Sequence, residues 1–207
     1  MTPSNAASSS PDPTVQPVPA SVVRQVDAAD ATLHNPKRAV LSLGANLGNR
    51  LENLQGAVDA LEDTPGVRVK GVSRVYETRP LGVPDGEHGE QGDYFNAVVL
   101  VKTTLPPSSL LERAQAIEEA FERVRDVRWG PRTLDVDIVS YQGVTSADPA
   151  LTLPHPRAHE RAFVLVPWHD VEPGAEVPGH GPLTELLPTV EGQGVTLRED
   201  LTLVLPD

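Results

Sequence analysis

The chain has 207 residues and a formal net charge of −12, with 22% charged residues, 39% hydrophobic residues and no cysteine. This composition fits one globular domain with tails, and it excludes disulfides, thiolate zinc sites and the broad basic surface that nucleic-acid backbones require. No apolar run approaches the ~18 residues of a membrane span. We therefore expect a cytoplasmic protein with neither a nucleic-acid nor a membrane partner.

The N-terminal residues 1–36 are dominated by Ala, Ser, Pro, Thr and Asp and show no hydrophobic periodicity. Such a segment has too little apolar mass to order itself, and it lacks the basic and apolar regions of a secretory signal. We predict a disordered tail over 1–36 and a single domain over 37–207.

The domain is predicted to begin with a strand, a loop and a helix. The apolar run Ala39–Leu43 predicts a buried strand that ends at Gly44. Asn49 and Glu52 form the pattern of a capping box at the start of the helix. The glycine-rich loop before them can bind phosphate at a helix N-terminus, but it lacks the P-loop and dinucleotide patterns, which favours a plain turn. The buried helix face is predicted to comprise Leu47, Leu51, Leu54, Val58 and Leu61.

Two further strands follow, after a helix break at residues 64–66. They are predicted over Val67–Tyr76 and Tyr94–Thr103, joined by a long, charged and glycine-rich loop over 77–93. The period of two in a strand places Tyr94 and Asn96 on one face.

A second helix is predicted to begin at Ser109, where Glu112 completes a capping box. Gln115 and Glu118 lie off the apolar stripe of this helix, so their spacing alone predicts a solvated face for both. The stripe itself comprises Leu110, Ala114, Ile117, Phe121 and Val124.

The run RWGPRTLDVDI, residues 128–138, holds the densest group of chemically active side chains. From Thr133 to Ile138 polar and apolar residues alternate, as in a half-buried strand. Asp135 and Asp137 would then share one face about 7 Å apart, from the ~3.3 Å rise per residue. Their charges repel unless a cation lies between them, and carboxylate oxygens suit Mg²⁺. An ordinary amphipathic strand with a solvated acidic face is the alternative.

Arginines gather just upstream of these aspartates, in a chain that is otherwise acidic. Guanidinium groups match phosphate geometry, and cations opposite a metal-binding carboxylate pair are typical of polyphosphate chemistry. The group is too small for a nucleic-acid duplex but sufficient for one nucleotide, so we predict a phosphoryl-transfer site. Its members are Arg123, Arg125, Arg128 and Arg132.

A second basic group follows Tyr141, and it includes two histidines, His155 and His159. The histidines raise the alternative of a zinc site. Pro156 follows the first of them, however, and no H-E-x-x-H pattern is present, which argues against zinc.

The order strand, helix, strand, strand, helix, strand predicts an α+β fold, namely a ferredoxin-like β-α-β-β-α-β layer with helices packed on an antiparallel sheet. The C-terminal additions are predicted to be a short helix over 161–169 and edge strands over 195–197 and 201–203. The sheet face opposite the helices would be left free for the site.

The run 128–138 closely resembles the signature of the 6-hydroxymethyl-7,8-dihydropterin pyrophosphokinase (HPPK) family of folate biosynthesis. The similarity extends from about Val40 to Pro173 and includes a G-x-N-x-G pattern after the first strand. This resemblance implies ATP as co-substrate, two Mg²⁺ ions, and transfer of diphosphate to the pterin hydroxymethyl group with release of AMP. The implied partners are these small molecules, and contact with other folate-pathway enzymes stays open.

The resemblance also implies roles for individual residues. Asp135 and Asp137 would bind the metal, and together with Arg123 and Arg132 they would form the catalytic group. The implied ATP contacts are Gln115, Glu118, Arg125, Trp129, Arg132, Ile138, His155 and Arg161. The implied pterin pocket comprises Thr78, Leu81, Tyr94, Asn96, Trp129 and Phe163, with Tyr94 and Phe163 stacking on opposite ring faces.

Two interpretations from other functional classes stay open at this point. A ferredoxin-like layer can serve as a ligand-binding regulatory module without activity. A two-carboxylate metal centre can also belong to a nucleotidyl transferase that acts on nucleic acid. The paired aspartates beside Arg132 argue against the first interpretation, and the acidic chain argues against the second.

Overall fold

The computed structural model describes residues 35–80, 92–121 and 133–206. These residues form a six-stranded antiparallel sheet in the order β10-β3-β4-β1-β5, with β2 also paired to β4. The first part of the chain supplies β1 (Lys37–Ala45), α2 (Arg50–Glu62), β2 (Val67–Val72), β3 (Tyr76–Thr78), β4 (Tyr94–Thr103), α3 (Pro107–Ala120) and β5 (Asp135–Tyr141).

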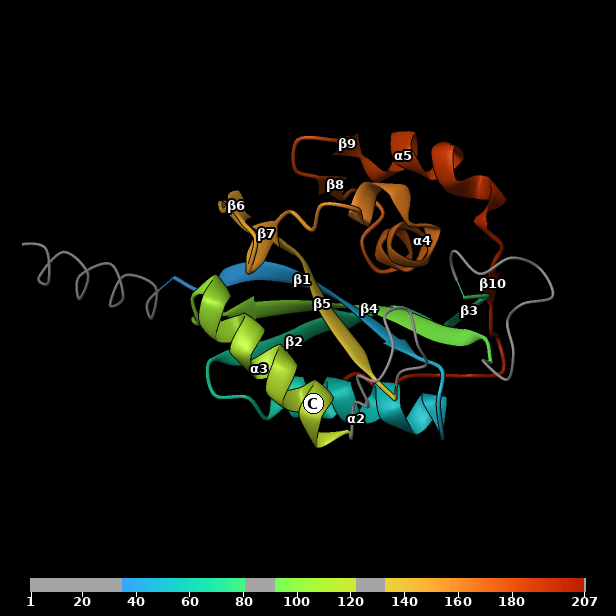
Figure 1. Ribbon diagram of the computed structural model, residues 1–207, viewed down its shortest axis with the longest axis horizontal. Helices are drawn as coiled ribbons and strands as arrows, with labels where there is room; N and C mark the ends of the chain where they lie inside the picture. The colour runs from blue at the N-terminus through green and yellow to red at the C-terminus, as the bar shows by residue number, and fades with distance from the viewer. Residues whose placement is uncertain (1–34, 81–91, 122–132, 207) are drawn as a thin grey trace, which may run out of the picture.

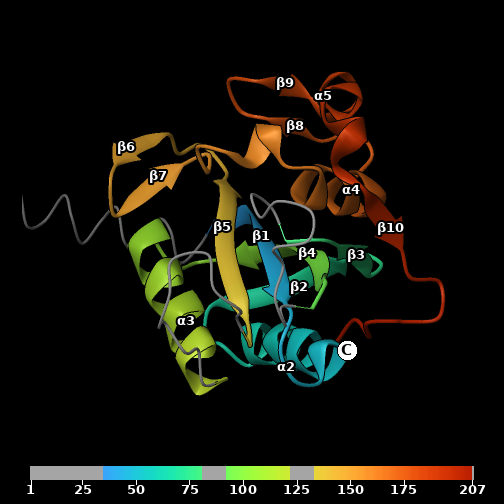
Figure 2. The ribbon, with the colours of Figure 1, turned by 45° about the vertical axis from the view of Figure 1, so that its right-hand side comes forward.

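The C-terminal part adds helices and short strands above and beside this layer (Figures 1 and 2). In order these are β6 (Ser146–Asp148), β7 (Leu151–Leu153), the 3-10 helix η1 (Ala158–Glu160), α4 (Ala162–Val171), β8 (Glu176–Val177), β9 (Gly181–Pro182), α5 (Leu183–Val190), the 3-10 helix η2 (Glu191–Gln193) and β10 (Val195–Leu197).

The ferredoxin-like layer that the sequence predicts is confirmed. Its four strands lie in the order β5-β1-β4-β2, all antiparallel, and α2 and α3 cover one face (Figure 1). Leu54, Val58 and Leu61 of α2 are fully buried, and Asn49 caps this helix by accepting a hydrogen bond from the Glu52 amide at 3.4 Å. The predicted cap at Asn49 is therefore observed, and so is most of the predicted stripe, although Leu51 is half-buried and Leu47 lies before the helix.

The second sheet face is partly covered by the C-terminal addition, contrary to the prediction that it would be free. Val40, Val98 and Val139 from three strands pack in one cluster with Leu165 and Trp168 of α4. Val139 lies on this face by the same alternation that places Asp135 and Asp137 there, whereas Tyr141, after a register shift between β1 and β5, belongs to the core beneath α2 and α3. Because α4 is apolar along most of its length, it is stable only when packed against such a surface.

The predicted strand over 67–76 is interrupted. Ser73 donates its backbone N–H to Val98 O at 2.9 Å and accepts the Val98 N–H on its hydroxyl, also at 2.9 Å. Arg74 leaves the ladder to pair with Asp170, at 2.5 Å between Nη2 and Oδ1. β2 and β3 are thus separate strands on the same edge of β4, and β3 takes the first residues of the predicted 77–93 loop.

Two other local predictions are wrong and two are confirmed. Helix α3 begins at Pro107 and not at the predicted Ser109, because the fixed φ of proline suits the first positions of a helix. The predicted capping box is absent, since no side chain caps this helix. Residues 201–203 form no strand, contrary to the prediction, although Leu203 is buried with 9% of its surface exposed.

The predicted edge strand over 195–197 and the predicted helix after Arg161 are both present.

Within the part of the chain that the structure describes, no helix is long and apolar enough to cross a membrane. The predicted tail over residues 1–36 falls almost wholly outside the described ranges, as do Val124 and most of the 77–93 loop.

We expect the packing of α4 against the sheet to contribute to global stability. Leu165 is fully buried against the sheet, so Leu165→Ala should lower the free energy of unfolding by about 2–5 kcal/mol through lost burial and a residual cavity. The matched control is Leu205→Ala, because Leu205 is 49% exposed and its truncation should change stability by less than ~0.5 kcal/mol. Urea denaturation of both variants measures the difference. Equal effects would mean that α4 does not fold together with the sheet.

Candidate functional site

The two aspartates of β5 lie on the sheet face that the alternation predicts. Asp135 and Asp137 are half-buried, whereas Leu134 and Val136 are buried among the residues beneath α2 and α3. Ile138 belongs to this same core and is 3% exposed. Any contact between Ile138 and ATP would therefore involve its backbone.

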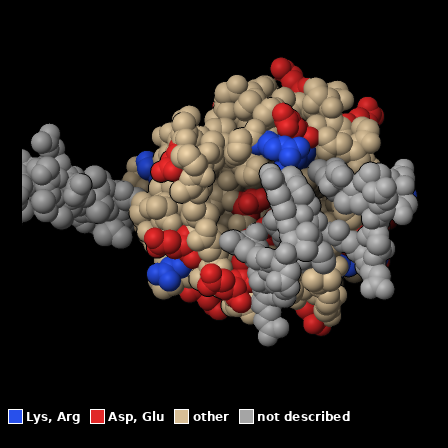
Figure 3. Space-filling view, viewed as in Figure 1, with Lys and Arg blue, Asp and Glu red and all other residues tan. Residues whose placement is uncertain are grey.

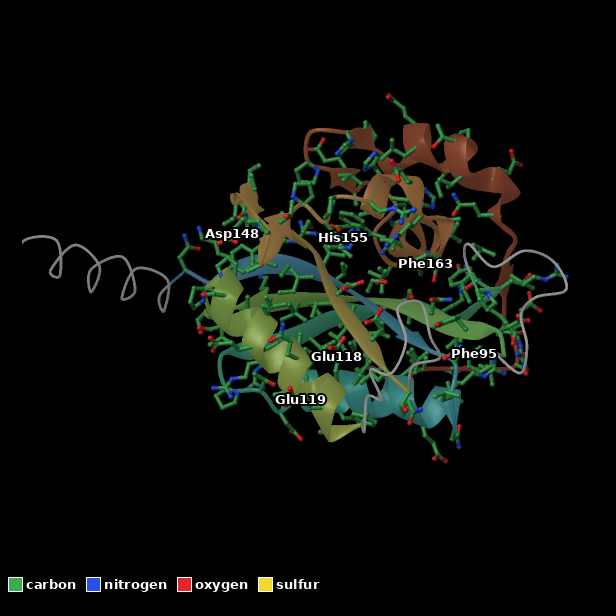
Figure 4. All side chains as sticks on the ribbon, viewed as in Figure 1. Phe95, Glu118, Glu119, Asp148, His155 and Phe163 are labelled. Carbon is green, nitrogen blue, oxygen red and sulfur yellow. The ribbon has the colours of Figure 1, made fainter. Side chains whose placement is uncertain are left out.

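Glu118 of α3 holds the strand between the aspartates. Its carboxylate Oε1 accepts a hydrogen bond from the Val136 N–H at 2.9 Å, and the residue is 3% exposed. The spacing-based prediction of a solvated position is thus wrong for Glu118 and correct for the exposed Gln115. Figure 4 shows Glu118 on the side of α3 next to β5 and Glu119 on its outer side. A hydrogen bond across elements decides this placement, which helical spacing alone cannot show.

A row of residues crosses the sheet from the aspartates to the predicted pterin residues. Asp135 is opposite Gly44 of β1, Gly44 is opposite Asn96 of β4, and Asn96 is opposite Tyr76 of β3. A methyl group on Gly44 would lie 3.5 Å from Asn96 Oδ1, 3.9 Å from Tyr94 Cδ1 and 4.0 Å from Asp135 Cβ. The missing side chain therefore leaves a gap between the carboxylate and the amide. The sequence places Gly44 only in a turn, because register is needed to find these neighbours.

The predicted pterin residues on β3 and β4 meet at this row. The Asn96 amide donates a hydrogen bond to the Thr78 hydroxyl at 2.8 Å, and both residues are buried. Tyr94 is half-buried and lies opposite Thr78 across the two strands. The polar atoms here are held by internal hydrogen bonds, which gives this part of the site a fixed shape.

Arg161 lies across from the aspartates, immediately before α4. Its guanidinium carbon is 5.4 Å from the centre of the Phe163 ring, within the range of a cation–π contact. Burial lowers the pKa of Arg161, while the charges of Asp137 and Asp135 oppose this change. Arg161 nevertheless stays protonated at neutral pH, so it faces the carboxylates as a cation.

His155 is held beside this arginine as a neutral imidazole. Its backbone N–H donates to Val139 O at 2.8 Å, and its Nδ1 accepts from the Arg157 N–H at 3.2 Å. Burial, together with the charge of Arg161, lowers the pKa of His155 to about 4. The proton of the neutral ring is thus on Nε2. Figure 4 shows His155 and Phe163 between α4 and the sheet.

The surface above the aspartate strand is hollowed. Figure 3 shows acidic side chains set back in the middle of this face, with basic side chains above them. Six predicted site residues lie outside the described ranges: Leu81, Arg123, Arg125, Arg128, Trp129 and Arg132.

The carboxylates of Asp135 and Asp137 fit Mg²⁺ by their chemistry, since both are hard oxygen donors on one half-buried strand face. In the described ranges no three or more His, Cys, Asp or Glu residues are grouped to hold a metal. Phosphate oxygens and water can supply further ligands for a cation at the aspartates. His159, the second member of the alternative zinc pair, stacks on His180 with ring centres 3.7 Å apart.

Comparison with known proteins assigns the chain to a family. Residues 40–173 match the model of the 7,8-dihydro-6-hydroxymethylpterin-pyrophosphokinase (HPPK) family. The chain belongs to this family. Proteins named 2-amino-4-hydroxy-6-hydroxymethyldihydropteridine pyrophosphokinase are similar along most of their length. The Mycobacterium leprae protein is 46% identical over 186 residues, 81% of this chain and 92% of that protein. The Methylorubrum extorquens protein is 42% identical over 158 residues, 76% of this chain and 96% of that protein.

Solved HPPK structures share the fold. The wild-type Plasmodium falciparum HPPK-DHPS chain with pteroate superimposes with a TM-score of 0.58 at 15% identity, over 77% of this chain and 45% of that one. The S436F/A437G/A613T triple mutant with pteroate gives a TM-score of 0.57 at 17% identity, over 74% of this chain and 43% of that one. This chain therefore spans less than half of either malarial chain, and at such identities the likeness supports the fold alone.

The Glu118 hydrogen bond predicts a graded response to substitution. Glu118→Ala leaves the buried Val136 N–H without this acceptor, so the free energy of unfolding should fall by about 1–3 kcal/mol. Glu118→Gln keeps an acceptor oxygen and should be less damaging. The exposed neighbour Glu119 supplies the control, Glu119→Gln. Chemical denaturation of the three variants distinguishes a positioning role from a surface position, for which all three would match the wild type.

The His155 pKa predicts a loss of stability in acid. Between pH 6.5 and about 4 the unfolded chain binds a proton on this imidazole that the folded chain does not, so the free energy of unfolding falls as the pH falls. His155→Gln should remove roughly 1–2 kcal/mol of that fall, less than the full shift because the ring is partly exposed. Urea denaturation at pH 7 and pH 4.5 without ATP measures it. An NMR titration midpoint near the ordinary histidine value would contradict the prediction.

Proposed function

We propose that the chain transfers the β,γ-diphosphate of ATP to the hydroxymethyl group of 6-hydroxymethyl-7,8-dihydropterin, releasing AMP, in folate biosynthesis. Family membership and the names of the relatives support this activity. The single observation that carries it in this chain is the row from Asp135 through Gly44 to Asn96. At one end of this row are two carboxylates, which suit a metal ion bound to phosphate. At the other end is the Asn96 amide, which is held by Thr78 and suits the polar edge of a flat heterocycle.

The reaction requires positioning more than chemical activation by the protein. The pterin hydroxymethyl oxygen attacks the β-phosphorus of ATP and loses its proton, and the bond from that phosphorus to the oxygen shared with the α-phosphorus breaks. AMP leaves with this oxygen. Because a hydroxyl is a weak nucleophile and the transferring group is highly charged, the site must align the two substrates and balance charge.

Asp135 and Asp137 are the residues that would hold Mg²⁺, for which we propose two ions. When bound, Mg²⁺ neutralises phosphate charge and favours deprotonation of a coordinated hydroxyl. The protein keeps both carboxylates on one face through the core packing of Val136 and through Glu118 beneath the strand.

Arg161 and His155 form the proposed nucleotide side of the site. Arg161 is partly buried beside the aspartates, where a guanidinium can bind phosphate oxygens in a bidentate manner. His155 offers an Nε2–H donor without adding charge. Sequence resemblance assigns the other ATP contacts to Gln115, Arg123, Arg125, Trp129 and Arg132, and these stay proposals.

Thr78, Tyr94 and Asn96 form the proposed pterin side, with Phe163 opposite them on α4. Helix α4 packs against β3 and β4, so an aromatic ring on the helix and one on the strand can flank a flat substrate. Leu81 and Trp129 are assigned to the same pocket by sequence alone. A cytoplasmic location and contacts with other folate-pathway enzymes are further proposals.

The metal proposal predicts that Asp135→Asn and Asp137→Asn each lower AMP formation by at least about 100-fold while the fold is retained. Each change removes a carboxylate charge and leaves the side-chain size unaltered. Asp148→Asn on the exposed strand β6 is the matched control and should keep wild-type turnover. Either site variant retaining wild-type turnover at limiting Mg²⁺ would remove the metal role from that residue.

The same assay tests the function itself through its products. ATP with hydroxymethyl-dihydropterin should yield AMP and the pterin diphosphate, identified by mass spectrometry. ADP would indicate transfer of a single phosphoryl group, pyrophosphate would indicate nucleotidyl transfer, and no product would favour a binding module.

A further inference from the structure

The strand that carries Thr78 is short, and a segment near the end of the described chain completes it. β3 has three residues and lies between β4 and β10, with Thr78 opposite Tyr94 on one side and Val195 on the other. The Arg198 N–H then donates to Val75 O at 2.9 Å. β10 lies beyond residues 40–173, which match the family model. Figures 1 and 2 show β10 beside β3, and the chain then running on toward α2.

On the reverse side of β3, two arginines hold one carboxylate. Glu77 Oε1 accepts from Arg50 Nη1 at 3.0 Å, and Oε2 accepts from Arg198 Nη1 at 2.9 Å. Arg50 also donates to the backbone oxygen of Asp93 at 2.6 Å, one residue before β4. Arg198 in addition pairs with Asp200 at 2.7 Å. Glu77 is therefore fixed from both the start of α2 and the C-terminal segment.

The same two arginines lie over Phe95. The guanidinium carbons of Arg50 and Arg198 are 3.6 Å and 5.1 Å from the ring centre, both within cation–π range. Phe95 is directly opposite Glu77 across β3 and β4. Since side chains alternate along a strand, Glu77 and Phe95 form the back of the two strands whose front carries Thr78, Tyr94 and Asn96.

We propose that Arg50, Glu77 and Arg198 are positioning residues that fix the pterin side of the site from behind. The identity of the ligand rests on the proposed function. A three-residue strand has few ladder hydrogen bonds of its own, so its position depends on neighbours. The Glu77 contacts set the distance between the Thr78 hydroxyl and the Asn96 amide, which is 2.8 Å. The C-terminal segment 195–200 thus supports the pterin side of the site from behind, and it lies outside residues 40–173 of the family match.

The first test needs no ligand. Arg198→Ala and Glu77→Gln should each speed amide hydrogen exchange at residues 76–78 by about fivefold, the scale of one lost ion pair. Exchange in the β1 residues 39–43 should stay at the wild-type rate, which separates local loosening from global unfolding. The matched control is Arg68→Ala, which removes the 2.7 Å ion pair between Arg68 on β2 and Glu62 at the end of α2. Unchanged exchange over 76–78 in both variants would overturn the proposal.

The second test measures binding and turnover of the full-length chain. Arg198→Ala should raise the pterin Kd about fivefold, while the ATP Kd and the kcat at saturating pterin stay at wild-type values. Arg198→Lys should bind the pterin more tightly than Arg198→Ala but less tightly than the wild type. Its ammonium group keeps the charge but lacks the planar guanidinium that pairs with both Glu77 and Asp200. An unchanged pterin Kd in Arg198→Ala would overturn the proposal. If the wild type itself fails to bind the pterin, the proposed function fails, and the exchange measurement still decides whether the Glu77 contacts hold β3.

Discussion

The central strand β1 sets the geometry of the site through its register with two partners. It pairs antiparallel to β5 on one edge and to β4 on the other, so Gly44 is opposite both Asp135 and Asn96. A shift of one residue on either edge would turn the aspartates or the amide into the core. The proposed contacts of the strand residues with metal and pterin thus depend on these two backbone ladders.

Two separate cores keep the ladders in place. The larger core lies beneath α2 and α3 and includes Leu134, Val136 and Ile138, the residues between and beside the aspartates. The smaller core lies beneath α4 on the site face, and it brings Arg161 and Phe163 over the sheet. The site therefore occupies the part of this face that α4 leaves uncovered. Because the sheet is packed on both faces, the strands that carry the site residues have little freedom to move.

Charge is arranged unevenly around this frame. The chain carries a formal net charge of −12, yet partly buried arginines meet the carboxylates at two places. In front of the sheet, Arg161 faces Asp135 and Asp137. Behind it, Arg50 and Arg198 share Glu77. The rear charges are satisfied by one another and by Asp200, so we assign a supporting role to the rear group and the proposed chemistry to the front group.

The sequence by itself determined the elements whose signals are local. The alternation in residues 133–138, the Asn49 cap and the stripe of α2 each depend on neighbours in the chain, and the structure confirms all three. The order of those elements was enough to predict the ferredoxin-like layer, since few topologies connect them without crossings. The family signature also lay within one continuous run.

Only the tertiary structure decided the features that join distant segments. Glu118 is buried because Val136 supplies a hydrogen-bond donor 18 residues away, and helical spacing carries no trace of that partner. Ser73 breaks the predicted strand because it pairs with Val98, and α4 covers a face that the sequence left open. The row through Gly44 and the contacts of Glu77 follow from strand register and from a C-terminal segment returning to β3. These are long-range pairings, and residue periodicity fixes the face of a strand but not the partner it meets.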